Sequence, residues 1–315
     1  MAKHKIGIIG LGKIAQDQHL PSIRENSDFE LLAVSSQRGL THADAQHTFS
    51  DWRELLKLPD LEAVSICTPP QVRHDIAREA LLAGKSVLLE KPPAATLSEL
   101  EDLRLLGARL GLTVYTTWHA QHNRGVDEAK SALAGQIVSR LLVTWKEDVR
   151  HWHPGQEWIW QAGGFGVFDP GINALSIVTR IMPYPIFIAG SDLQFPSNRD
   201  APIAADLRFS ASQGGDLAAC FDWRQTGPQS WDIEVDTATG TKLRLSGGGS
   251  RLDIDGRMIV DEKAEEYEGI YRRFDELLTT RTSEVDDAPF RLVADAFMIG
   301  RRIVVEAFED TPDGH

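Results

Sequence analysis

A glycine-rich turn close to the start of the chain constrains its fold more than any other feature. The run Gly10-Leu11-Gly12-Lys13-Ile14-Ala15 follows a short β-branched segment and opens a helical pattern. Gly10 permits a tight turn, Gly12 lets the backbone approach a pyrophosphate, and Ala15 allows the helix to pack closely on the strand. The run therefore predicts a dinucleotide site at the first strand-to-helix turn. The cofactor contacts predicted there are Gly10, Gly12, Lys13 and Ile14.

The first 117 residues place this turn in an alternating strand and helix pattern. Continuous apolar runs, typical of strands covered on both faces, predict strands at residues 5–10, 30–35, 62–67, 86–90 and 113–117. Helices are predicted at residues 72–83 and at Leu97–Leu110, the second of which follows a capping box of Thr96 and Glu99. This alternation predicts an α/β Rossmann domain with a doubly wound parallel sheet over residues 1–120.

Beyond residue 122 the pattern changes to runs that alternate apolar with polar residues, separated by glycine-rich turns. The predicted strands are residues 140–149, 186–193, 216–223, 231–237, 242–245 and 251–254. Helices are predicted at residues 125–134, 267–279 and 289–308, and the last six residues are typical of a loose tail. We therefore expect a substrate-binding α+β domain over residues 121–315, with a large open antiparallel sheet. Whether a closing helix returns to the first domain stays open.

Charge and cysteine content exclude several classes of protein. With 33 basic and 46 acidic residues, the net charge of −13 argues against a nucleic-acid partner, which requires a basic surface. Two cysteines exclude a disulfide framework and a zinc site of several thiolates, and without an HExxH motif no metal is expected. No apolar run is long enough to cross a membrane. The sequence predicts a soluble, cytoplasmic protein without a membrane partner.

The end of the second strand indicates which dinucleotide binds. An NAD site places an acidic residue there to hold the ribose 2′-hydroxyl. This chain instead has Ser36, Gln37 and Arg38, a hydroxyl and a guanidinium suited to a 2′-phosphate. NADP is therefore the predicted cofactor, and use of NAD at lower efficiency stays open.

Polar residues also follow the third and fourth strands, where ligands bind in open parallel sheets. Thr68 and Pro69 follow the third strand, His74 lies on the helix after them, and Glu90 and Lys91 follow the fourth strand. Prolines after each strand fix rigid turns. These five residues are predicted to contact the cofactor, with Lys91 directed at its nicotinamide end.

Three segments together resemble a known family. GLGKIA, CTPPQVRHDIAREALLAGKSVLLEKPP and GGFGVFDPGIN occur in this order and resemble the GFO/IDH/MocA oxidoreductases over nearly the whole chain. The block from Trp145 through the GGFGVFDPGIN segment resembles the bacterial L-arabinose 1-dehydrogenase/D-galactose 1-dehydrogenase branch. This resemblance implies oxidation of C1 of an aldopyranose to a lactone, with NADP as hydride acceptor.

One position departs from the wider family pattern. Most members have DxGxH, whose histidine is an acid/base, whereas this chain has Asp169-Pro170-Gly171-Ile172-Asn173. An amide neither takes nor gives a proton at neutral pH, so the proton must move through another group. Asp169 followed by Pro170 predicts a helix start with the aspartate at the N-cap.

The chemistry suggests three catalytic residues. Asp169 is the predicted general base, Lys91 stabilises the developing alkoxide, and Asn173 hydrogen-bonds the reacting oxygen or its neighbour. The exchanged assignment, with neutral Lys91 as the base, stays open.

Sugar binding requires hydrogen-bonding side chains and aromatic faces. Glu147 follows Val143 and Trp145 at strand spacing, which places it inward, where it needs partners. The predicted substrate contacts are Lys91, His119, Glu147, Trp152, His153, Asp169, Asn173 and Trp231.

Two alternative functions remain open, and a homo-oligomer is predicted. The chain could be another NADP-dependent sugar or polyol dehydrogenase of the family, or a non-catalytic sensor that binds cofactor and sugar. A sheet with one uncovered face also predicts a homo-oligomer formed through the C-terminal domain.

Overall fold

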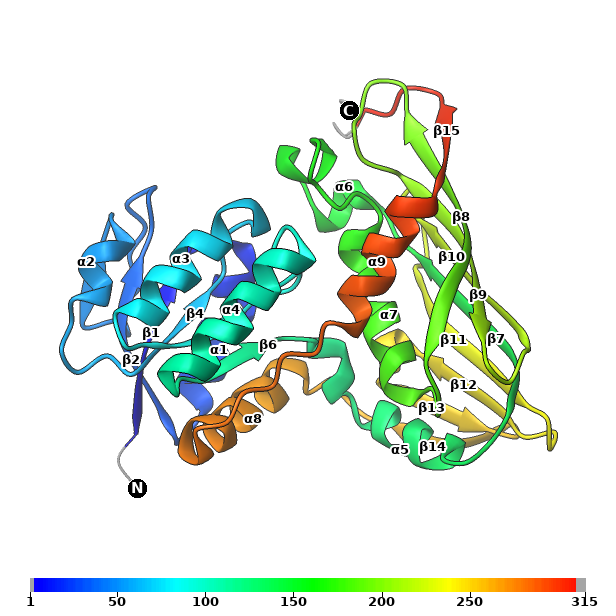
Figure 1. Ribbon diagram of the computed structural model, residues 1–315, viewed down its shortest axis with the longest axis horizontal. Coiled ribbons are helices and arrows are strands. Elements are labelled where there is room, and N and C mark those ends of the chain that lie inside the picture. The colour runs from blue at the N-terminus through cyan, green and yellow to red at the C-terminus, as the bar shows by residue number, and fades with distance from the viewer. Residues whose placement is uncertain (1–2, 310–315) are drawn as a thin grey trace. The chain divides into compact units, whose positions relative to one another are not determined.

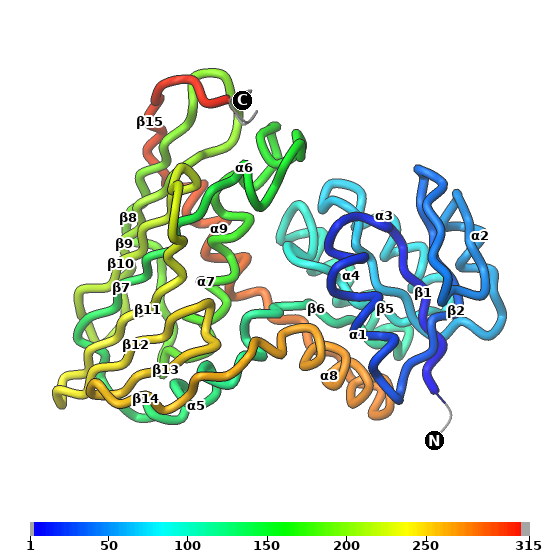
Figure 2. Tube along the Cα trace, turned by 180° about the vertical axis from the view of Figure 1, so that it is seen from behind, coloured from blue at the N-terminus to red at the C-terminus, as the bar shows by residue number. Residues whose placement is uncertain are grey.

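The computed structural model describes residues 3–309, so the predicted C-terminal tail lies outside the described residues. The chain divides into two compact units. Unit 1 comprises Met1–His119 and Glu266–Asp287, and unit 2 comprises Ala120–Glu265 and Ala288–His315. The predicted second domain covers residues 121–315, with the return of a closing helix left open, and the structure assigns helix α8 (Glu266–Thr280) to unit 1. Figure 2 shows this return of the chain in orange.

The sheet of unit 1 has the strand order β3-β2-β1-β4-β5-β6, and each neighbouring pair is parallel. Its strands are β1 (His4–Ile9), β2 (Phe29–Ser35), β3 (His47–Phe49), β4 (Ala63–Ile66), β5 (Ser86–Leu89) and β6 (Val114–Thr116). The order reverses direction between β1 and β4, which makes the carboxyl ends of these strands the expected place for a ligand. The predicted doubly wound sheet is confirmed.

The helical segments of unit 1 lie between its strands, apart from α8, which comes from later in the chain. They are the π-helical segment η1 (Ala15–His19), α1 (Leu20–Glu25), α2 (Trp52–Leu56), α3 (Pro70–Leu82), α4 (Leu97–Leu110) and α8. The predicted capping box of α4 is present, because Thr96 Oγ1 accepts from the Glu99 amide at 3.2 Å and Glu99 accepts from the Thr96 amide at 3.2 Å. β3 and α2 were not predicted because both are too short to show a period.

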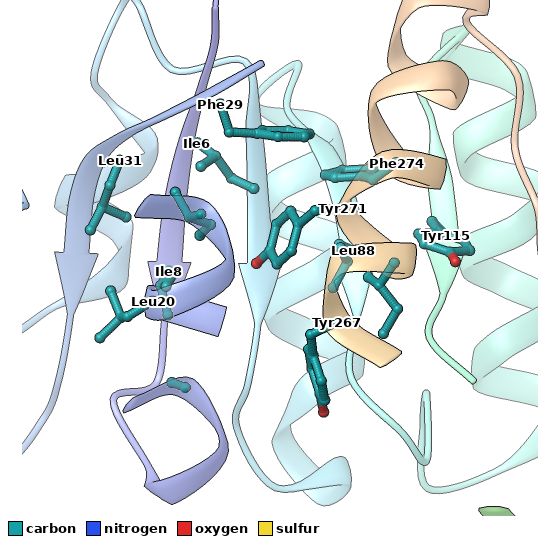
Figure 3. Packing of buried hydrophobic residues seen from close by; sticks show 14 of the residues in the cluster. Ile6, Ile8, Leu20, Phe29, Leu31, Leu88, Tyr115, Tyr267, Tyr271 and Phe274 are labelled. Atoms are coloured by element: carbon teal, nitrogen blue, oxygen red, sulfur yellow. The ribbon is translucent and has the colours of Figure 1, made fainter. Parts of the chain in front are cut away.

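Aromatic residues of α8 complete the core of unit 1. Phe274 stacks on Phe29 of β2 with ring centroids 6.0 Å apart, and Tyr271 meets the same ring edge-on at 5.3 Å. Figure 3 shows these side chains beside Ile6 of β1. A helix from late in the sequence thus provides apolar area that the first 119 residues leave uncovered.

The sheet of unit 2 has the strand order β14-β13-β12-β11-β7-β10-β9-β8-β15. Its strands are β7 (Val138–Lys146), β8 (Ile186–Pro196), β9 (Ala204–Ala211), β10 (Asp216–Asp222), β11 (Ser230–Thr237), β12 (Lys242–Ser246), β13 (Arg251–Ile254), β14 (Arg257–Asp261) and β15 (Arg301–Val305). The expected antiparallel sheet is present, but the pairs β10–β7 and β15–β8 are parallel, so the sheet is mixed.

Helices cover one face of this sheet (Figure 1). Apart from α8, the helical segments from η2 onward are η2 (His119–His122), α5 (Arg124–Leu133), α6 (Val149–Trp152), η3 (Glu157–Trp160), α7 (Phe168–Ile181), η4 (Gly247–Gly249) and α9 (Ala288–Ile299). Along β7, Val143 and Trp145 are buried whereas Leu142 and Thr144 are partly exposed, which is the alternation expected of a sheet covered on one side.

The predicted closing helix over residues 289–308 is wrong in its second half. Helix α9 ends at Ile299, and β15 (Arg301–Val305) pairs with β8 instead. Gly300 marks the change, because a Cβ there would lie 2.5 Å from the Ala296 carbonyl oxygen and 2.7 Å from Leu193. The β-branched residues after Gly300 then favour a strand.

Candidate active site

The glycine turn of unit 1 has the geometry of a phosphate-binding turn. Gly10 has a φ of +95° and donates its amide to the Ser35 carbonyl at 2.9 Å. A Cβ on Gly10 would lie 3.1 Å from the Thr68 amide nitrogen, whereas the Cβ position of Gly12 has open space around it. The backbone at Gly12 is therefore accessible to a ligand. Thr68 Oγ1 is buried without a hydrogen-bond partner in the described residues, so this turn fits a dinucleotide.

The end of β2 carries a positive charge beside this turn. Arg38 is exposed and donates a hydrogen bond to the Leu11 carbonyl at 3.4 Å, while Ser36 is buried and donates its amide to Phe49. Gln37 is exposed between them. Lys13 pairs with Asp17 on the exposed side of the helix.

The loops after β4 and β5 place the other predicted cofactor residues. Pro69 is the N-cap residue of α3. Lys91 is partly buried, and its amide donates to the Glu90 carboxylate at 2.8 Å. His74 contacts carboxylates on both sides, Asp102 at 3.0 Å and Asp75 at 3.3 Å, so its ring links α3 to α4.

His119 is the one predicted substrate residue besides Lys91 that unit 1 contains. Its Nδ1 lies 2.8 Å from Glu266, and its ring stacks on Tyr267 with centroids 5.5 Å apart. Burial lowers the pKa of His119, but the charges of Glu266 and Glu90 outweigh burial and raise the pKa above its ordinary value. The His119 imidazole therefore stays protonated to a higher pH than that of a free histidine.

Unit 2 brings Asp169 to the first turn of α7, but not to the N-cap. The N-cap residue is Val167, which makes no side-chain cap bond, and the Asp169 amide donates to the Gly166 carbonyl at 2.9 Å. The prediction of a capping aspartate is therefore wrong. The chain turns earlier because Gly166, with φ of +52°, lies against Pro202, where a Cβ would approach the Pro202 carbonyl to 2.3 Å. The Asp169 carboxylate is buried at 3% exposure.

A histidine links Asp169 to a second carboxylate. His153 Nε2 lies 3.5 Å from Asp169 Oδ2 and 3.9 Å from Glu147 Oε1. His153 follows α6 and Glu147 follows β7, so three separate elements of unit 2 converge here. The imidazole lies within ion-pairing distance of both acids.

Glu147 is inward-facing, as its strand spacing predicted, and it has two indole partners. Trp231 donates to Oε2 at 2.9 Å and Trp223 donates to Oε1 at 3.3 Å. Trp231 in turn packs on Trp152, with ring centroids 5.4 Å apart. The two hydrogen bonds and the ring contact together hold the Glu147 carboxylate and the aromatic rings in one cluster.

Trp152 forms part of an open wall beside this cluster. Its ring is 38% exposed, and it borders a surface hollow of about 370 Å³. The hollow is lined by Asp148, His151, Trp152, Gly227, Pro228 and Gln229. An exposed indole next to polar groups is the surface that a sugar needs.

Asn173 lies one turn after Asp169 on α7. Its Oδ1 is buried without a hydrogen-bond partner in the described residues, which leaves it an acceptor for a ligand hydroxyl. Among residues 3–309, no group of three or more His, Cys, Asp or Glu side chains is arranged so that it could hold a metal ion, and no helix is long and apolar enough to cross a membrane.

Several residues of these sites were not found by sequence reasoning. They are His19, Arg73, Trp223, Tyr267 and Tyr271. Arg73 lies within the CTPPQVRHDIAREALLAGKSVLLEKPP segment and also bonds the nearby Thr68 carbonyl. The other four lie in no quoted motif, and the fold brings them to partners that are distant along the chain.

Comparisons with known proteins agree with this geometry. Residues 4–117 match the GFO/IDH/MocA family model, described as an oxidoreductase family with an NAD-binding Rossmann fold. The chain is 44% identical over 308 residues to galactose 1-dehydrogenase of Pseudomonas fluorescens, covering 97% of this chain and 99% of that protein.

Solved structures share the fold over nearly the full length. A D-galactose-1-dehydrogenase protein from Rhizobium etli superimposes with a TM-score of 0.93 at 52% identity, covering 98% of this chain and 99% of that one. A 3-ketoreductase from Actinomadura kijaniata, in complex with NADP, shares the fold with a TM-score of 0.82 at 16% identity, covering 96% and 99%. The turn, the two-unit architecture and these similarities show that the chain belongs to the GFO/IDH/MocA family of oxidoreductases.

Proposed function

We propose that this oxidoreductase oxidises C1 of an aldopyranose, L-arabinose or D-galactose, to the aldonolactone with NADP as the hydride acceptor. The observation that carries the proposal is the buried Asp169 carboxylate, 3.5 Å from His153, in a unit that also offers the exposed Trp152 ring. The two galactose 1-dehydrogenase relatives support the choice of sugar, since identity to them reaches 44% and 52%.

The chemistry assigns complementary roles to two side chains. Oxidation removes the hydroxyl proton at C1 and a hydride from the same carbon, and the electron pair left on oxygen forms the lactone carbonyl. Asp169 takes the proton, and the Lys91 ammonium stabilises the developing alkoxide. The NADP nicotinamide, when bound, supplies the acceptor for the hydride. Lys91 belongs to unit 1 and Asp169 to unit 2. Their proposed roles follow from the chemistry of an ammonium group and a carboxylate.

The remaining polar residues orient the sugar. Asn173 offers its unpartnered buried oxygen to a hydroxyl. Glu147 receives one indole bond on each carboxylate oxygen, and this carboxylate is the proposed acceptor for a sugar hydroxyl. The other proposed contacts are His119, Trp152, His153 and Trp231.

Initial rates across a panel of aldoses, measured with NADP and with NAD, test the proposal. We expect turnover of L-arabinose and D-galactose with NADP preferred. Turnover of polyols or other sugars alone would contradict the substrate assignment. NADPH binding without turnover of any sugar would instead favour a sensor.

Replacing Asp169 tests its role. We expect Asp169→Asn to lower kcat about 10²- to 10⁴-fold, as for loss of a positioned base. Asp127→Asn, an exposed aspartate on α5, is the control and should retain full activity. If Asp169→Asn turns over at the normal rate while Lys91→Met does not, the lysine is the base.

A further inference from the structure

A histidine and a glutamate form a buried ion pair beneath the predicted lysine. His19, the last residue of η1, is fully buried, and Glu90, directly after β5, is 2% exposed. His19 Nε2 lies 3.1 Å from Glu90 Oε1. Burying two ionisable groups is costly unless they are paired and hydrogen-bonded, so the role of this pair needs an explanation beyond packing.

Donors of unit 1 use both oxygens of Glu90. Oε1 accepts from the Tyr267 hydroxyl at 2.7 Å and from His19, and Oε2 accepts from the Lys91 amide at 2.8 Å. The carboxylate is therefore bonded to the peptide from which Lys91 starts. It holds the N–H side of the Glu90–Lys91 peptide.

His19 is itself held on its other side. Its Nδ1 lies 2.7 Å from the Tyr271 hydroxyl, which lies 3.0 Å from Ser65 Oγ. The Tyr267 ring meets the imidazole edge-on, with centroids 5.0 Å apart. Figure 3 shows both tyrosines projecting from α8. The imidazole therefore has little freedom to rotate away from Glu90.

The pKa values of His19 and Glu90 are both shifted toward the charged forms of these groups. Burial lowers the pKa of His19, but Cys67, Tyr271 and Glu90 together outweigh burial and raise the pKa well above its ordinary value. Burial would raise the pKa of Glu90, whereas the bond and charge of His19 lower it to about 2. Both groups are charged at neutral pH, which makes the bond between them a strong one.

A second side chain binds backbone carbonyls of the same loop without involving His19. The buried guanidinium of Arg73 donates to the carbonyls of Glu90, Pro92 and Thr68. Loss of His19 would therefore leave Tyr267 as the remaining donor to Glu90 Oε1 and loosen the carboxylate that accepts the Lys91 amide, while the loop remains attached through Arg73.

We propose that His19 is a positioning residue for Lys91: it holds the Glu90 carboxylate where this group accepts the Lys91 amide, and that bond fixes the point at which the lysine leaves the sheet. The inference rests on the proposed function only for the catalytic role of Lys91. Its expected consequence is on turnover rather than on cofactor affinity, because misplacing a catalytic group by about 1 Å costs about 100-fold in rate.

Substitutions at His19 test the proposal. We expect His19→Ala to lower kcat about 10- to 100-fold, with KM for the sugar and Kd for NADPH within about threefold of the wild type. His19→Gln, which retains an N–H donor toward Glu90, should recover most of the rate. Tyr267→Phe, which removes only one bond to Glu90 and keeps the ring, should give an intermediate rate.

Amide exchange gives a readout that does not depend on turnover. We expect the Lys91 amide to exchange about tenfold faster in His19→Ala, since its acceptor is no longer fixed. His4→Gln is the matched control, because His4 also contacts carboxylates, Glu62 at 2.8 Å and Asp275 of α8 at 3.4 Å, but lies at the amino end of β1. That variant should exchange and turn over as the wild type does.

The outcomes separate the two proposals. Folded His19→Ala or Tyr267→Phe with unchanged Lys91 exchange and unchanged kcat would overturn the positioning role. An equal loss in NADPH affinity and kcat would also overturn it. A wild-type protein that turns over no aldose would refute the proposed function, while the exchange result would still decide the role of His19.

Discussion

Arg38 is the residue whose charge we propose selects NADP over NAD. Its guanidinium extends from the loop after β2 to the Leu11 carbonyl in the glycine turn, and the neighbouring Ser36 and Gln37 carry no charge. A 2′-phosphate near this guanidinium would form charge-assisted hydrogen bonds, whereas a 2′-hydroxyl would gain much less.

We expect Arg38→Ala to weaken NADPH binding about 10- to 100-fold, the loss for a hydrogen bond to a charged group. NADH binding should change less than about threefold. Fluorescence titration of both cofactors measures the two constants. Arg24→Ala, an exposed arginine on α1, is the control. Equal weakening of both cofactors would contradict a 2′-phosphate contact.

Glu90 should make stability depend on pH in the acid range. Its pKa is about 2 in the folded protein against an ordinary value of 4.5, so the unfolded chain takes up the proton first. The contribution of this carboxylate to stability is therefore full above pH 4.5 and is lost as the pH falls toward 2. The pKa of His19 is raised, so its imidazole stays protonated throughout this window.

We expect the unfolding free energy of the wild type to fall relative to that of Glu90→Gln by about 1 kcal/mol per pH unit between about pH 4 and pH 3. Urea unfolding at a series of pH values measures the difference. Glu54→Gln, which removes an exposed carboxylate, should run parallel to the wild type. A constant difference between wild type and Glu90→Gln would show that Glu90 titrates normally.

At the scale of elements, glycines serve two separable purposes. A Cβ on Gly12 would have nothing within 4 Å, so packing does not require a glycine there, and we propose that the cofactor does. A Cβ on Gly107 of α4 would lie 2.4 Å from Val114 Cγ2, so that residue is small for the sake of helix-on-strand packing. The β-branched Val114 has little freedom to give way.

These two glycines should therefore respond in opposite ways. We expect Gly12→Ala to leave the unfolding free energy within about 0.5 kcal/mol of the wild type and to weaken NADPH binding at least about tenfold. Gly107→Ala should cost about 1–3 kcal/mol of stability and leave NADPH affinity unchanged. Denaturant unfolding and NADPH titration on the same samples decide. Loss of stability in Gly12→Ala would show an intramolecular role for that residue.

At the scale of the whole molecule, the sheet of unit 2 leaves one face without helices (Figure 1). Ala218 of β10 lies on that face, in register with Leu142 of β7 and Arg208 of β9, and it is only partly buried. We propose that a second copy of the chain covers this face.

We expect the wild type to be a dimer or a larger homo-oligomer in light scattering, and Ala218→Arg to lower its mass toward that of one chain, 34.9 kDa. An arginine there would bury a charge without a partner. Leu105→Arg, at an exposed position of α4, is the control. A wild-type monomer, or an unchanged assembly in Ala218→Arg, would exclude this face as the interface.

Features that depend on local order could be predicted from the amino-acid sequence. The glycine turn, the parallel alternation of strands and helices and the capping box at Thr96 follow from neighbouring residues, because turn geometry and backbone periodicity are local properties. The inward position of Glu147 followed in the same way from strand spacing.

Only the tertiary structure decided which distant side chains meet. The sequence gives no period or motif that would send α8 back to the first sheet, pair His19 with Glu90, or place Trp223 and Trp231 on Glu147. It also gave Asp169 a capping role, because Asp-Pro favours one locally, whereas the packing of Gly166 on Pro202 starts the helix earlier and leaves the carboxylate to contact His153. Such contacts depend on burial and on the shape of the whole unit, which no short segment encodes.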